Sequence, residues 1–76
     1  MSVAWYTRIL MRHLSTTGIA RVHCYAVSEG VARARLHNAA RRLGVTITTT
    51  LDRTQYPPTV IGTVTGPYPP TIGGGG

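Results

Sequence analysis

The chain has 76 residues, which is enough for one domain at most. It carries eight arginines, no lysine and only two acids, Glu29 and Asp52, for a formal net charge of +6. No uninterrupted apolar run reaches the roughly 18 residues that a membrane span needs. Because Cys24 is the only cysteine, an intrachain disulfide framework is excluded.

The segment from Val3 to Leu14 fits two patterns. If it is a strand, alternate residues share one face, namely Trp5, Thr7, Ile9 and Met11. If it is a helix, larger side chains recur every three to four residues, namely Tyr6, Ile9, Leu10 and His13. The polar residues at 15–18 lead directly into the next strand, which favours a hairpin. We therefore expect a strand here and keep the helix as the alternative.

The segment from Ile19 to Val27 alternates clearly and predicts a half-buried strand. Small side chains form one face, namely Ala20, Val22, Cys24 and Ala26, and polar or aromatic ones form the other, namely Arg21, His23 and Tyr25. Because the first face is made of small side chains, another element must pack closely over it.

Residues 28–44 predict a helix with both ends marked. Ser28 is a favourable N-cap, Glu29 lies in the first turn, where the helix dipole favours an anion, and Gly44 fits the left-handed position after the last turn. At 100° per residue, five apolar side chains fall on one stripe, namely Ala32, Leu36, Ala39, Ala40 and Leu43.

Two further alternating segments, 45–51 and 59–65, predict strands on either side of a turn that contains Pro57 and Pro58. The expected fold is a small α+β domain over 1–65, in the order β-β-α-β-β, with one helix packed on a largely antiparallel sheet. Residues 66–76 are rich in proline and glycine and predict a flexible tail. A core this small gives marginal stability, so a homodimer is one expected arrangement.

Candidate residues for catalysis and metal binding are few. His23 and Cys24 are neighbours on a predicted strand, so their side chains point to opposite faces and cannot form a nucleophile pair. No pair of histidines or cysteines has the spacing of a closed zinc site, and no glycine-rich phosphate loop precedes the helix. We therefore expect a protein that is not an enzyme and uses no metal or cofactor.

The basic surface is the strongest functional signal. The helix carries basic side chains on both flanks of its apolar stripe, and the strand from Ile19 adds another on its outer face. The predicted binding residues are Arg33, Arg35, Arg41, Arg42, Arg21 and His37. Arginines so arranged can contact phosphates, so the expected partner is nucleic acid (DNA or RNA). An acidic protein surface is the alternative partner.

Two resemblances accompany these patterns. The segment from Val31 to Thr48 reads VARARLHNAARRLGVTIT and resembles small orphan proteins of actinobacterial phages, in which an arginine- and alanine-rich helix runs into a threonine- and valine-rich strand. That resemblance implies a phage or mobile-element protein located in the cytoplasm of the host cell. The expected topology is also similar to ubiquitin-like β-grasp proteins, and Gly75-Gly76 would match their conjugated terminus.

Overall fold

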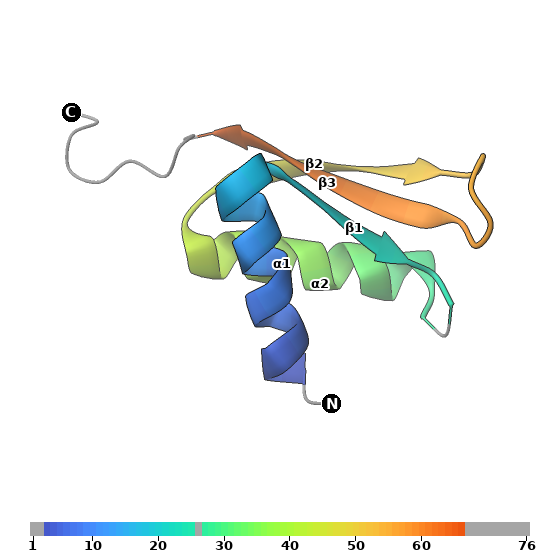
Figure 1. The fold of residues 1–76 in the computed structure, drawn as a ribbon, viewed down its shortest axis with the longest axis horizontal. Coiled ribbons are helices and arrows are strands. Elements are labelled where there is room, and N and C mark those ends of the chain that lie inside the picture. The colour runs from blue at the N-terminus through green and yellow to red at the C-terminus, as the bar shows by residue number, and fades with distance from the viewer. Residues whose placement is uncertain (1–2, 26, 67–76) are drawn as a thin grey trace.

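A computed structural model of the chain describes residues 3–25 and 27–66. Its elements, in chain order, are α1 (Val3–Thr17), β1 (Ile19–His23), α2 (Glu29–Leu43), β2 (Thr46–Asp52) and β3 (Thr59–Gly66). The α+β class is confirmed. The predicted β-β-α-β-β order is wrong, because the first element is a helix and the observed order is α-β-α-β-β (Figure 1).

The first segment is helical because helical spacing brings its buried side chains onto one face. The hydroxyls of Ser15 and Thr16 donate to the carbonyl of Arg12, at 3.0 and 2.8 Å, so they are satisfied within the last turn, although such bonding does not itself favour a helix. Gly18, with a φ of 76°, ends the helix, and its N–H donates to the Leu14 carbonyl at 3.1 Å. The buried side chains then recur at helical spacing, namely Thr7, Leu10 and Leu14.

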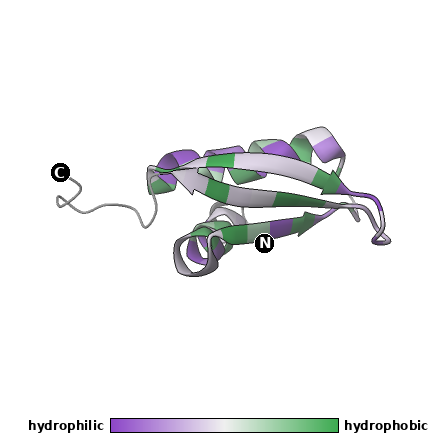
Figure 2. Cartoon of the chain, turned by 90° about the horizontal axis from the view of Figure 1, so that it is seen from above, coloured by the Kyte–Doolittle hydropathy of each residue, from purple (hydrophilic) through white to green (hydrophobic). Residues whose placement is uncertain are grey.

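The three strands form one antiparallel sheet in the order β1-β3-β2, so β1 and β2 are its edges. Both helices pack on one face of this sheet (Figure 1). Figure 2 looks onto the opposite face and shows the strands uncovered. The outward side chains of β1 lie on that face, because Arg21 and His23 alternate with the buried Ala20 and Val22.

The helix α2 has the predicted ends and the predicted apolar stripe. The Ser28 side chain accepts a hydrogen bond from the N–H of Val31 at 3.2 Å, and Gly44 has a left-handed φ of 84°. Leu36 is fully buried over the middle of the sheet. There Gly62 on β3 stands between two other small residues, Ala20 on β1 and Thr49 on β2. The element that packs closely over the small side chains of β1 is therefore α2, through Leu36.

The predicted strands 45–51 and 59–65 are confirmed at nearly the predicted bounds. Beyond Gly66 the predicted tail lies outside the described residues. Within 3–25 and 27–66, neither helix is long and apolar enough to cross a bilayer.

Candidate nucleic-acid interface

Both acidic side chains of the sequence are engaged by neighbours. Glu29 Oε2 accepts hydrogen bonds from Arg33, at 2.9 Å from Nε and 2.8 Å from Nη2. Asp52 accepts from the Thr54 hydroxyl, the Gln55 amide and the Thr54 N–H, and these bonds, the hydroxyl first, lower the pKa of its carboxyl below the ordinary value. Asp52 therefore stays anionic, and among the described residues only Arg33 forms an ion pair with an acidic side chain.

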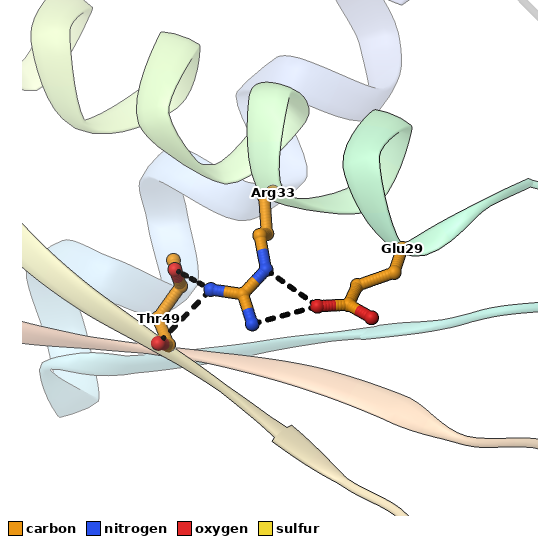
Figure 3. A network of polar contacts seen from close by, with 3 residues as sticks. All are labelled: Glu29, Arg33 and Thr49. Carbon is orange, nitrogen blue, oxygen red and sulfur yellow. Dashed lines mark hydrogen bonds and ion pairs between the residues drawn. The ribbon is translucent and has the colours of Figure 1, made fainter.

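Arg33, a predicted binding residue, links α2 to the sheet (Figure 3). Besides its ion pair with Glu29, its Nη1 donates to the Thr49 hydroxyl at 2.7 Å and to the Thr49 carbonyl at 3.2 Å. Two of the three nitrogens of the guanidinium thus hold Glu29 in the first turn, and the third holds β2. Arg33 contributes to the packing of α2, and each of its guanidinium nitrogens has a partner within the protein.

We expect Arg33→Met to lower the free energy of unfolding by about 1 kcal/mol, because it removes a partly exposed ion pair and two hydrogen bonds while keeping an apolar stem. Urea denaturation measures this loss. Binding of an oligonucleotide should change less than about twofold. A large loss of binding with unchanged stability would return Arg33 to the interface.

Arg35, also a predicted binding residue, lies over an aromatic ring of α1. Its guanidinium carbon is 5.0 Å from the centroid of the Tyr6 ring, which is within the range of a cation–π contact. Arg35 therefore joins the two helices, as Arg33 joins α2 to the sheet. The middle of α2 is consequently less available for a ligand than its sequence indicates.

The other four predicted residues are exposed, but they lie on two different elements. His37, Arg41 and Arg42 occupy the C-terminal half of α2, and Arg21 lies on the edge strand β1. The structure thus brings part of the predicted set together on α2. It places Arg21 in a second region, at the edge of the sheet.

That second region is a groove between α1 and β1. It has a volume of about 370 Å³, at the lower end of the range for sites that hold small ligands. Ile9 and Leu10 contribute apolar surface. The other lining residues are aromatic, basic or apolar, and come from both elements: Trp5, Tyr6, His13, Ile19, Arg21 and His23.

A second hollow adjoins this groove on α1. It measures about 380 Å³ and is lined by Arg8 and Arg12 together with Trp5 and Ile9, which also line the first groove. Arg8 and Arg12 are four residues apart, so they lie on the same face of the helix. Two exposed arginines therefore stand beside the aromatic groove, and Arg21 stands on its other wall.

The groove also holds an imidazole with a hydrogen-bond partner on the sheet. His23 Nδ1 lies 2.8 Å from the Thr59 hydroxyl, which holds the imidazole on the outer face of the sheet. In the part of the chain that the structure describes, no three side chains of the metal-binding types gather. Guanidinium groups and planar rings are well suited to bind phosphates and flat heterocycles.

The sequence does not predict the groove, because it exists only where α1 is a helix and β1 is an edge strand. Arg8 and Arg12 are absent from the predicted binding residues, since the segment that carries them is expected to be a strand. The helical spacing of Tyr6, Ile9 and His13 was the one available signal. Comparisons of the chain with protein-family models, curated proteins and solved structures found no significant match.

Proposed function

We propose that this protein is a non-enzymatic module that binds nucleic acid through contacts between arginines and phosphates. One observation carries the proposal: six of the eight arginines are exposed, and the sequence has only two acids, of which Glu29 is paired with Arg33. The exposed arginines are Arg8, Arg12, Arg21, Arg41, Arg42 and Arg53.

The physical basis is the release of condensed counterions when cations contact phosphates, which supplies most of the affinity in sequence-independent binding. A guanidinium also forms two parallel hydrogen bonds to a phosphate, which an ammonium cannot do. The exposed arginines are spread over two helices, one strand and one loop. Such a spread suits contacts along a sugar–phosphate backbone better than the reading of base edges by one helix.

A salt series tests the proposal. We expect a labelled oligonucleotide of random sequence to bind, and its affinity to fall between about 50 and 200 mM salt with a log–log slope of roughly −2 to −4, which corresponds to three to six phosphate contacts on a single strand. Fluorescence anisotropy provides the readout. Polyglutamate serves as the control, because an acidic protein surface should compete poorly with a phosphate backbone.

Undetectable binding of both single strands and duplex at the lowest salt would contradict the proposal. Capture of an acidic protein from a nuclease-treated lysate, together with tighter binding of polyglutamate than of the oligonucleotide, would favour the alternative partner.

A further inference from the structure

We infer that the preferred ligand is a single-stranded nucleic acid that runs along β1, with its bases stacked on aromatic rings and its phosphates on the flanking arginines. This inference rests on the proposed function and names the substrate class of the same protein. It depends on an arrangement of rings and charges that no single element provides.

The first part of the path is the groove between α1 and β1. Trp5 is 46% exposed and lies where the two adjoining hollows meet, since it lines both. His13 on α1 and His23 on β1 line the same groove. Flat side chains in an open, partly apolar groove provide stacking surfaces for unpaired bases, which all have a π face.

The second part of the path continues past the end of β1. The rings of His23 and Tyr25 are in tilted contact, with centroids 6.1 Å apart, and Tyr25 is 80% exposed. Tyr25 and the fully exposed Tyr56 line a further hollow of about 350 Å³, together with Pro57. The rings therefore follow β1 from α1 to the loop between β2 and β3.

The charges follow the same path. Arg8 and Arg12 line the hollow at the α1 end, and Arg21 lies in the groove near the middle. Beyond the end of β1, Arg53 lines a separate hollow together with Glu29 of α2, whose carboxylate opposes a phosphate there. Because exposed arginines stand at the α1 end and in the middle of this path, a phosphate backbone can pass beside the rings along β1, which is about 17 Å long for five residues.

A duplex does not fit this arrangement. The bases of a duplex are already stacked and paired, so they offer no free face on which the exposed rings could stack. A groove of this size also cannot admit a double helix. The element that could enter a major groove is α2, but Arg33 and Arg35 are engaged with Thr49 and Tyr6. The combination of rings and arginines is typical of proteins that bind single strands.

The experiment uses the full chain and its single tryptophan, Trp5. We expect a thymidine oligonucleotide to quench the tryptophan fluorescence and to bind at least about 10-fold more tightly than a hairpin duplex of equal phosphate number. An abasic oligonucleotide with the same backbone should bind about 10-fold more weakly and without quenching, because it offers phosphates but no rings.

Variants test whether the preference for single strands comes from the rings along β1. Trp5→Ala should weaken single-strand binding about 10-fold and duplex binding less than about twofold, and Trp5→Phe should restore most of the affinity. Val31→Ala, at an exposed apolar position on α2, is the matched control and should change neither. Circular dichroism checks that each variant is folded.

The possible failures are distinguishable. Salt-dependent binding in which the duplex equals the single strand and the tryptophan is not quenched overturns the inference and leaves the proposed function standing. If none of the three oligonucleotides binds, the proposed function is overturned, and the inference with it.

Discussion

Replacing Leu36 by alanine is expected to lower the free energy of unfolding by about 3–4 kcal/mol, the largest loss of stability that we predict for a single substitution. Leu36 is fully buried at the centre of the contact between α2 and the sheet. Its two terminal carbons lie 3.2 and 3.4 Å from the position that a Cβ on Gly62 would occupy. The side chain thus fills the hollow above the small residues Ala20, Gly62 and Thr49.

The cavity left by this substitution cannot close easily. The residues below Leu36 are held by the paired backbones of three strands, so only side chains can move, and small ones cannot fill the space. Residues 3–66 are expected to have a total stability of about 3–10 kcal/mol at roughly 0.05–0.15 kcal/mol per residue. The variant should therefore unfold at a temperature lower by more than about 12 °C, or be unfolded at 25 °C.

Chemical denaturation followed by circular dichroism measures the loss. Val31→Ala removes apolar atoms from an exposed position of the same helix and should change the free energy of unfolding by less than about 0.5 kcal/mol. A loss below about 1 kcal/mol for Leu36→Ala would contradict the packing of α2 over Gly62.

The elements that the sequence predicts well have local signals at both ends. For α2, the Ser28 cap, the apolar stripe and Gly44 all agree. For β2 and β3, large apolar residues recur four positions apart, namely Ile47 and Leu51, and Val60 and Val64. The N-terminal segment carries two periods at once, and its Ser-Thr-Thr run is typical of a loop. The burial of Leu10 and Leu14 in the core decides the outcome, and it depends on tertiary packing, which composition does not reveal.

The candidate site was predictable only in part, for a similar reason. The sequence identifies which residues are basic, but the availability of each arginine depends on its neighbours in space. The spacing of Glu29 and Arg33 predicts a helical ion pair from the sequence. The contact of Arg35 with Tyr6 cannot be predicted in this way, because it depends on how α1 crosses α2. The groove likewise depends on the strand order, which places β1 at an edge.

Charge reversal is expected to distinguish the contribution of the groove arginines to binding from that of the α2 arginines. We compare Arg12→Glu/Arg21→Glu with Arg41→Glu/Arg42→Glu, in which all four positions are exposed. Each pair changes the net charge by the same amount, so the long-range attraction of nucleic acid is weakened equally. Any difference in affinity between the two variants then reports direct contact with phosphates.

The groove variant should bind a single strand about 100-fold more weakly than the native protein, and its salt slope should be shallower by about 1.4, because two phosphate contacts are lost. The affinity of the α2 variant for a single strand should fall less than about 10-fold, and its salt slope should not change. Arg41 and Arg42 add to the electrostatic field of the protein but do not lie beside the rings. Anisotropy titrations at several salt concentrations measure both quantities. A larger loss in the α2 variant would place the interface on that helix, where the sequence alone predicts it, while equal losses with equal slopes would mean that the ligand is held by charge over the whole surface.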